Sequence, residues 1–294
     1  MTGAMKGALS LPWSGVKAAQ FVSQLNPDLV VAVGGYAAGP MTAMASMLGR
    51  KTALLEQNAV PGMTNRWLAK FVDRAYVSFE STKDQFPSAL CQVVGNPIRK
   101  AIVDRVQSVN YIPPTSGLKI LVIGGSGGAH ALNVGLPEAL KKLSPEIRAQ
   151  VQIRHQTGRN RLASASQAYK DYDGKFELTE FIDDMVEAYS WCDLLICRAG
   201  MSTIAEVTAL GIPAIYVPLP TADGHQIANA LQIAESGGGM MIPNDEVGSD
   251  RMTRLLEGLF RNPVSLGQLG SKAKSLGHPD AARVVAQDLL DWIK

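Results

Sequence analysis

The sequence predicts an α/β protein with two domains, each built on a parallel sheet covered by helices. First, 294 residues with 46% hydrophobic and 18% charged side chains suffice for two ordinary domains and exclude a disordered chain. Second, nearly continuous apolar segments alternate with helical stretches, as in strands that are buried on both faces of a parallel sheet. Third, an apolar strand running into a glycine turn occurs twice, as VVAVGGYAAGP at 30–40 and ILVIGGSGGA at 120–129.

The apolar segments define ten expected strands. They are Leu29–Val33, Thr52–Leu55, Ala75–Phe79, Gln92–Val94, Lys119–Ile123, Val151–His155, Phe176–Leu178, Leu194–Cys197, Ala214–Val217 and Met240–Ile242. The chain is expected to open with a loop and one helix near Val16–Leu25. The later helices are expected up to Leu143, at Arg161–Lys170, Asp184–Trp191, Thr203–Leu210 and Gln226–Glu235, and from Ser249 onward.

Domain boundaries follow from these elements and from a proline-containing stretch that ends in Pro113-Pro114. We expect a first domain at 1–100, a linker at 101–117, a second domain at 118–276, and a C-terminal helix at 277–294 that packs back on the first domain. The first domain has few strands for an α/β domain, so it is expected to be incomplete at its N-terminal side.

Charge is nearly balanced, with a formal net charge of +2, which argues against a nucleic-acid-binding protein that relies on gross charge. Residues 1–100 carry ten Lys and Arg against five Asp and Glu, whereas residues 101–294 carry 18 against 21. The basic front indicates either an anionic partner or ordinary variation in surface charge.

Cysteine and hydropathy patterns bear on the compartment. Cys91, Cys192 and Cys197 fit neither a disulfide framework nor a zinc motif, which indicates buried thiols in a reducing compartment. The uncharged stretch Leu29–Gly49 is interrupted by glycines and by Pro40, so it predicts a strand, a turn and a helix. No transmembrane helix is predicted.

The turn Gly124–Ala129 follows a strand and precedes a helix, a place where backbone N–H groups suit a phosphate. It does not match G-x-G-x-x-G, because the third glycine would fall at His130. It does match G-x-S-x-G, so an α/β-hydrolase is the alternative. Ser126 would then be the nucleophile, and the rest of the triad would come from His225 or His278 and Asp193 or Asp223.

The segment Arg198–Glu206 opens another helix after a buried strand. Thr203 and Glu206 have the spacing of a capping box, and spacing alone favours that structural interpretation. The functional interpretation places the backbone amides at a diphosphate and Glu206 at a ribose. Gln226 and Asn229 lie three apart and so share one face of the next helix.

Seven ordered motifs together resemble one family, the bacterial transferases that add N-acetylglucosamine from its UDP ester to lipid-linked N-acetylmuramyl-pentapeptide. The motifs span nearly the whole chain. They are VGGYAAGP (33–40), EQNAVPGMTNRWLAK (56–70), VGNPIRKAI (94–102), VIGGSGGAHALN (122–133), TEFIDDM (179–185), CRAGMSTIAEV (197–207) and HQIANA (225–230).

The resemblance implies two Rossmann-like domains facing a cleft, the GT-B arrangement, and an inverting transferase of peptidoglycan synthesis. It implies no cofactor and no metal. The expected contacts to UDP-N-acetylglucosamine are Asn58, Arg99, Ser126, Ile182, Met201, Ser202, Thr203, Ile204, Ala205, Glu206 and Gln226. Of these, Glu206 would hold the ribose, Ile182 would meet the uracil through its backbone, and Gln226 would bind sugar hydroxyls.

The resemblance assigns the acceptor side to the first domain, at Gly34, Gly35 and Tyr36. The expected partners are the undecaprenyl-linked acceptor and the anionic cytoplasmic face of the inner membrane. Leu9, Leu11 and Trp13 would form a membrane-adhering patch beside basic residues, and core packing of the three is the alternative.

Two departures from the family pattern limit what the resemblance implies. The family's N-terminal strand and GGTGGH loop have no counterpart, and Leu55 stands where a His usually precedes EQN. The general base is therefore unassigned, with Glu56 as a weak candidate. Two alternatives to the transferase remain: an inactive UDP-sugar-binding module and a UDP-sugar epimerase on the same fold.

Overall fold

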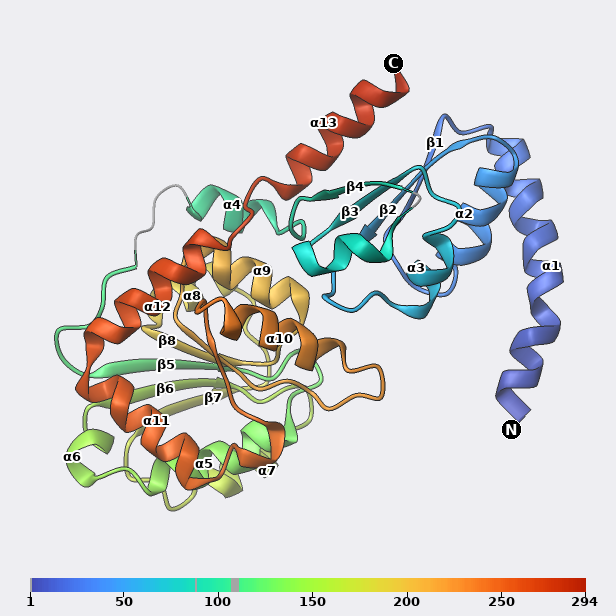
Figure 1. Cartoon of the computed structure of the whole chain (residues 1–294). Helices are drawn as coiled ribbons and strands as arrows, with labels where there is room; N and C mark the ends of the chain where they lie inside the picture. Colours follow the sequence, from blue (N-terminus) through green and yellow to red (C-terminus); the bar gives the residue numbers. More distant parts are fainter. Residues whose placement is uncertain (1, 88, 107–110) are drawn as a thin grey trace. The chain divides into compact units, whose positions relative to one another are not determined.

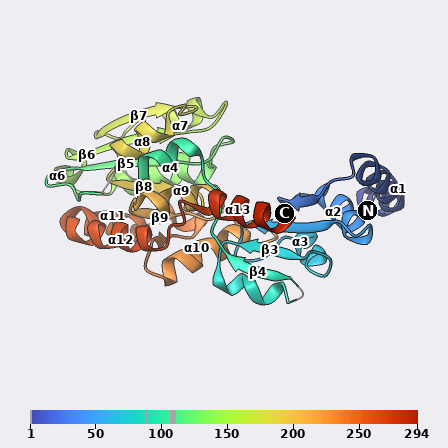
Figure 2. The same cartoon turned by 90° about the horizontal axis from the view of Figure 1, so that it is seen from above.

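The computed structural model describes residues 2–87, 89–106 and 111–294, with only the backbone described for residues 2–12. The chain divides into two compact units, shown from two directions in Figures 1 and 2. Unit 1 comprises Met1–Asn96 and Asp280–Lys294, and unit 2 comprises Pro97–Pro279. Part of the expected linker is helical: α4 (Lys100–Val106) belongs to unit 2, where it packs on α9 and Ile102 is fully buried.

Unit 1 contains a four-stranded parallel sheet in the order β1-β2-β3-β4. The strands are β1 (Leu29–Ala32), β2 (Lys51–Glu56), β3 (Arg74–Val77) and β4 (Leu90–Val93). The helices are α1 (Thr2–Leu25), α2 (Ala38–Met47), α3 (Met63–Leu68), the 3-10 helix η1 (Glu80–Gln85) and α13 (Ala281–Ile293).

Alternate residues of the unit 1 strands face two different helical layers, as the period of a strand requires. Leu54 and Ala75 pack with Leu68 of α3. Their neighbours Ala53 and Tyr76 pack instead with Val285 and Leu289 of α13. The last helix thus completes the core of the first unit, although unit 2 separates the two in sequence.

A carboxylate fastens α13 to the sheet. Asp288 accepts hydrogen bonds from the Arg74 guanidinium and the Tyr76 hydroxyl, each 2.5 Å long. The Arg74 guanidinium also lies over the ring of Trp292, 4.4 Å from its centroid. Burial alone would raise the pKa of Asp288, but the hydrogen bonds it accepts and the charge of Arg74 together outweigh burial and lower the pKa below its ordinary value.

The expected N-terminal loop is wrong, because α1 is helical from Thr2 and continues through Pro12. Alanine, leucine and methionine are good helix formers, and one proline removes only one backbone bond from a helix of 24 residues. Ala18 and Val22, four residues apart and therefore on one face, are buried where α1 packs on α2. Both views show α1 alongside α2 (Figures 1 and 2).

Unit 2 contains a six-stranded parallel sheet in the order β10-β9-β8-β5-β6-β7. The strands are β5 (Leu118–Ile123), β6 (Val151–Gln156), β7 (Lys175–Thr179), β8 (Leu194–Cys197), β9 (Ala214–Tyr216) and β10 (Met240–Met241). The helices after α4 are the π-helical turn η2 (Ala131–Gly135), α5 (Leu136–Lys141), α6 (Pro145–Arg148), α7 (Leu162–Tyr169), α8 (Met185–Trp191), α9 (Met201–Leu210), α10 (His225–Glu235), the 3-10 helix η3 (Asn244–Glu246), α11 (Asp250–Arg261) and α12 (Pro263–Ser275).

Helices cover both faces of this sheet. Figure 1 shows α8, α9 and α12 above the strands and α5, α7 and α11 below them. The central strands β5, β8 and β9 are accordingly mostly apolar and buried, and β8 is buried at all four positions. The edge strand β7 is exposed at three of its five positions. All ten strands expected from the sequence are present, with ends shifted by at most two residues.

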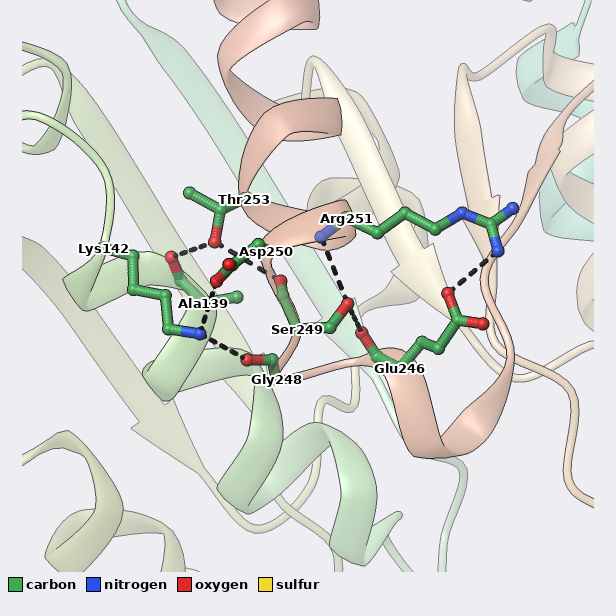
Figure 3. A network of polar contacts seen from close by, with 8 residues as sticks. All are labelled: Ala139, Lys142, Glu246, Gly248, Ser249, Asp250, Arg251 and Thr253. Atoms are coloured by element: carbon green, nitrogen blue, oxygen red, sulfur yellow. Dashed lines mark hydrogen bonds and ion pairs between the residues drawn. The ribbon is translucent and has the colours of Figure 1, made fainter.

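A polar network holds the start of α11 against α5 (Figure 3). Ser249 is the N-cap residue, and its hydroxyl accepts a hydrogen bond from the amide of Arg251 at 3.2 Å. Lys142, next to the end of α5, pairs with Asp250 at 2.8 Å, and the Thr253 hydroxyl donates to a carbonyl of α5 at 3.0 Å. These contacts satisfy the end of one helix and the start of another with each other's groups.

Candidate nucleotide-binding site

The strand order of unit 2 identifies where a ligand would bind. From β5 the chain moves outward to β6 and β7 and then returns to β8 on the other side of β5. In open parallel sheets, ligands bind outside the carboxyl ends of the strands at such a reversal. The loops that follow β5 and β8 therefore border the candidate site, and both contain motifs expected to bind the nucleotide.

The loop after β5 is a tight glycine turn. Gly125 and Gly128 have φ of +84° and +71°, and the amide of Gly128 donates to the carbonyl of Gly125 at 3.0 Å. A Cβ atom on Gly128 would lie 2.1 Å from the carbonyl oxygen of Thr157, so only glycine fits. The tip of the turn, 125–127, is exposed. It presents backbone amides without side-chain cover.

The loop after β8 leads into α9, whose N-cap is Gly200 in an extended conformation. The first amide with a partner four residues back is that of Ile204, which donates to Gly200, so the amides of Met201–Thr203 precede the helical ladder. The expected capping box is wrong. The helix begins two residues before Thr203, which places Glu206 in the second turn, away from the cap.

Glu206 instead joins three elements of unit 2. Its carboxylate accepts a bidentate pair from Arg99, with Nε–Oε1 at 2.7 Å and Nη2–Oε2 at 2.9 Å. The Tyr189 hydroxyl of α8 donates to Oε2 at 3.1 Å. The hydrogen bond to Glu206 raises the pKa of Arg99, and burial raises that of Tyr189 well above its usual value, so a neutral phenol donates to an ion pair.

Two further expected donor-site residues of unit 2, Gln226 and Ile182, have hydrogen-bond partners, and so does Arg198 in the loop before α9. The side-chain oxygen of Gln226 accepts from the amide of Leu219 at 3.0 Å, which leaves the side-chain NH₂ group of Gln226 on the opposite side of the amide. The amide of Ile182 donates to Gln156 at 3.0 Å. Half-buried Arg198 donates to the carbonyl of Val217 at 3.0 Å and to Asn244 at 2.7 Å, and so connects the β8 loop to the end of β9.

Asn58 belongs to unit 1, whereas the ten other expected UDP-sugar contacts lie in unit 2. Asn58 donates through its amide and its side chain to Glu56 at 2.8 and 3.2 Å. Glu56 also accepts from Gly62 and Asn65 and is only 3% exposed. Four donors converging on one buried carboxylate fix the loop after β2, and this arrangement argues against a general base at Glu56.

Gly34 and Gly35, expected on the acceptor side, follow β1 with φ of +97° and +85°, and Tyr36 is 86% exposed. On α1, Trp13 is 66% exposed and the ammonium of Lys17 lies 5.6 Å from its ring centroid. The alternative of core packing is therefore wrong for Trp13. The side chains of Leu9 and Leu11 lie outside the described residues.

The cysteines, possible metal ligands and helix hydropathy were expectations for the whole chain, and the described residues bear on each of them. Cys192 and Cys197 are buried, as expected, while Cys91 is half-buried, and all three are free thiols. Within the described ranges, no three His, Cys, Asp or Glu side chains are grouped so as to hold a metal ion. None of the helices described is both long enough and apolar enough to cross a bilayer.

Sequence reasoning missed two residues that shape the site, Tyr189 and Gln156. Nothing in the sequence around Tyr189 signals its contact with Glu206, because that contact depends on the packing of α8 against α9. Gln156 carries a weak signal: β6 alternates apolar and polar residues from Val151 to Arg154 and then ends in two polar residues, His155 and Gln156, that are both buried.

Two parallel α/β units, the second with amide-lined loops at a strand-order reversal, define the GT-B class of glycosyltransferase fold. Family models match both units: the glycosyltransferase family 28 C-terminal domain at residues 119–285 and the glycosyltransferase family 28 N-terminal domain at residues 1–77. MurG from Acinetobacter baumannii superimposes with a TM-score of 0.82 at 33% identity, covering 97% of this chain and 80% of that one.

Relatives found by sequence similarity indicate the same family. The UDP-N-acetylglucosamine–N-acetylmuramyl-(pentapeptide) pyrophosphoryl-undecaprenol N-acetylglucosamine transferase of Geobacter sulfurreducens is 36% identical over 97% of this chain and 79% of its own length. The Myxococcus xanthus enzyme of that name is 36% identical over 98% and 74%. The chain belongs to this transferase family.

Family membership settles one alternative. The α/β-hydrolase interpretation of Ser126 is wrong, because the G-x-S-x-G match, a turn with four glycines, lies within the part of the chain that matches the glycosyltransferase family 28 C-terminal domain. A UDP-N-acetylglucosamine 2-epimerase from Neisseria meningitidis superimposes with a TM-score of 0.67 at 13% identity, over 96% of this chain and 80% of that one. That likeness concerns the fold alone.

Proposed function

We propose that the chain transfers N-acetylglucosamine from its UDP ester to undecaprenyl-pyrophosphoryl-N-acetylmuramyl-pentapeptide, with inversion at the anomeric carbon. The observation that carries the proposal is the cluster at the carboxyl edge of the unit 2 sheet. The exposed glycine turn, the open amides of α9 and the Arg99–Glu206 pair all belong to that one unit. Relatives more than 35% identical carry the same activity in their names.

The chemistry requires stabilisation of a departing diphosphate. The acceptor hydroxyl oxygen forms a bond to the anomeric carbon while the bond from that carbon to the diphosphate oxygen breaks, and the hydroxyl proton passes to a base. Negative charge grows on the UDP leaving group. The amides of Ser126 and Gly127 and those of Met201–Thr203, at the positive end of the α9 dipole, are suited to receive it.

Nucleoside recognition is proposed at Glu206 and Ile182. A carboxylate accepts about four hydrogen bonds, and three acceptor positions on Glu206 are occupied by Arg99 and Tyr189. A ribose diol would therefore share Glu206 with Arg99 or displace it. The half-exposed Arg99 side chain then becomes available to a phosphate or to the base. The NH₂ group of Gln226 is proposed to donate to a sugar hydroxyl.

The acceptor and the membrane are proposed partners of unit 1. The exposed turn at Gly34–Tyr36 would meet the acceptor. Trp13, exposed next to Lys17 on α1, supports peripheral attachment to an anionic surface, because it combines an apolar ring with a basic neighbour. We place the protein at the cytoplasmic face of the inner membrane, in the synthesis of peptidoglycan.

A transfer assay with UDP-N-acetylglucosamine, with and without the lipid-linked acceptor, tests the proposal. We expect a β-linked disaccharide on the lipid and release of UDP only when the acceptor is present. Donor binding without transfer would identify an inactive binding module. Conversion of the donor with no acceptor present would identify an epimerase.

A further inference from the structure

Gln156 links two loops of the candidate site through a single side chain. It is the last residue of β6 and is 3% exposed. Its Nε2 donates to the carbonyl of Gly125 at 3.1 Å, in the glycine turn after β5. Its Oε1 accepts from the amide of Ile182 at 3.0 Å, in the loop after β7. Both ends of the amide are therefore used.

The bond from Gln156 helps to orient the amides of the glycine turn, because it is the second hydrogen bond to the Gly125 carbonyl, which also accepts from the amide of Gly128. In a planar trans peptide, the C=O of one residue and the N–H of the next point in opposite directions. The carbonyl of Gly125 points to Gln156, and the carbonyl of Ser126 accepts from the amide of Arg159 at 3.3 Å. The N–H groups of Ser126 and Gly127 consequently point away from the loop that follows β6.

Gln156 is not needed to hold the loops together. The amides of Thr157 and Gly158 donate to the carbonyls of Thr179 and Glu180 at 2.8 and 3.1 Å. Gly128 and Gly158 approach each other so closely that a Cβ on Gly158 would lie 2.2 Å from the amide nitrogen of Gly128. What Gln156 adds is a hydrogen bond to one particular peptide group in each loop: the Gly125 carbonyl, which it shares with the amide of Gly128, and the Ile182 amide.

We propose that Gln156 is a positioning residue for the UDP donor, coupling the amides expected at the diphosphate to the loop expected at the uracil. This inference rests on the proposed function of unit 2. It follows that the side chain at 156 must donate on one side and accept on the other. An amide does both, and a protonated carboxylic acid does too, whereas an ionised carboxylate only accepts.

The test is the variant Gln156→Glu, with UDP affinity measured by calorimetry on the full chain between pH 5.5 and pH 8. Burial raises the pKa of a carboxyl group above its ordinary value, so the protonated fraction grows toward the lower end of this interval. At pH 8 the carboxylate repels the Gly125 carbonyl, and we expect UDP affinity at least about tenfold below that of the unmodified chain. As the pH falls, the acid regains its donor and the affinity ratio should approach one.

The UDP affinity of the variant is divided by that of the unmodified chain at the same pH, which cancels the effects of the titration of UDP and of neighbouring groups. Those groups, on β6 and the three loops, are His130, Arg154, His155, Arg159, Arg161, Glu180, Asp183 and Asp184. Gln152→Glu is the matched control, because Gln152 is exposed on the same strand, and its ratio should stay near one throughout.

Gln156→Met provides a second variant that has neither donor nor acceptor and does not titrate. We expect it to bind UDP at least about tenfold more weakly at every pH. Affinity unchanged in Gln156→Met, or a Gln156→Glu ratio independent of pH, would overturn the inference. Absence of UDP binding by the unmodified chain would instead refute the proposed function, so the two failures are distinguishable.

Discussion

Replacing Glu206 by glutamine tests the ribose contact, because the variant keeps the shape of the side chain and removes its charge. The Glu206 side chain is 9% exposed. A hydrogen bond to a charged group contributes about 1.5–3 kcal/mol net, against about 0.5–1.5 kcal/mol for a neutral pair. Two ribose hydroxyls that meet an amide in place of a carboxylate therefore lose about 2 kcal/mol together, which is about thirtyfold in UDP affinity.

The assay compares UDP with 2′,3′-dideoxyuridine 5′-diphosphate by titration calorimetry. The Glu206→Gln variant should bind UDP about thirtyfold more weakly and the dideoxy ligand almost as well as the unmodified chain does. Arg99 is 54% exposed, so solvent screening limits the loss of folding stability to about 1 kcal/mol. Glu235→Gln, at an exposed position of α10, is the control. Equal losses for both ligands, or none for either, would refute the ribose assignment.

Three further predictions concern stability. Because hydrogen bonding lowers the pKa of Asp288 in the folded state, Asp288 adds to the free energy of unfolding above about pH 4, and this stabilisation is lost as the pH falls through the folded pKa. The variant Asp288→Asn should therefore lose less stability at acid pH than the unmodified chain does, as measured by urea titration. Burial lowers the pKa of His155 to about 4, so only the unfolded chain binds the proton between pH 6.5 and 4, and the free energy of unfolding should fall by about 3 kcal/mol over that interval. A flat profile, or one unchanged in His155→Gln, would contradict this. Gly128→Ala should destabilise the chain by more than about 3 kcal/mol in thermal melts, because its Cβ overlaps backbone, whereas Gly127→Ala, with open space around its Cβ, should change stability by less than about 1 kcal/mol. Similar melting temperatures for both variants would be inconsistent with the turn geometry.

The sheet architecture was predictable because its signals are local. Most strands are short apolar runs, and runs such as Leu194–Cys197 are buried at every position because both faces of the sheet are covered. The first half of α1 was expected as a loop for the opposite reason. Pro12 and nearby glycines signal a break, but the rest of the segment favours a helix, and α2 provides a surface for it.

The candidate site was predictable in its residue types and less so in its contacts. The glycines at the end of β5 located the turn in the sequence. This signal is reliable because a side chain at position 128 would collide with the carbonyl of Thr157, so the turn requires glycine there. The capping-box interpretation of Glu206 failed because spacing along one helix carries no information about Arg99 and Tyr189, which reach it from other elements. Gln156 was overlooked for the same reason.

Calorimetry of the unmodified chain with UDP and with ADP tests the central claim most directly, because the two ligands share the ribose and the diphosphate and differ in the base. The account predicts saturable heat with UDP and at least about tenfold weaker binding of ADP. No saturable heat with UDP, or equal affinity for the two nucleotides, would contradict a uridine-diphosphate site in unit 2.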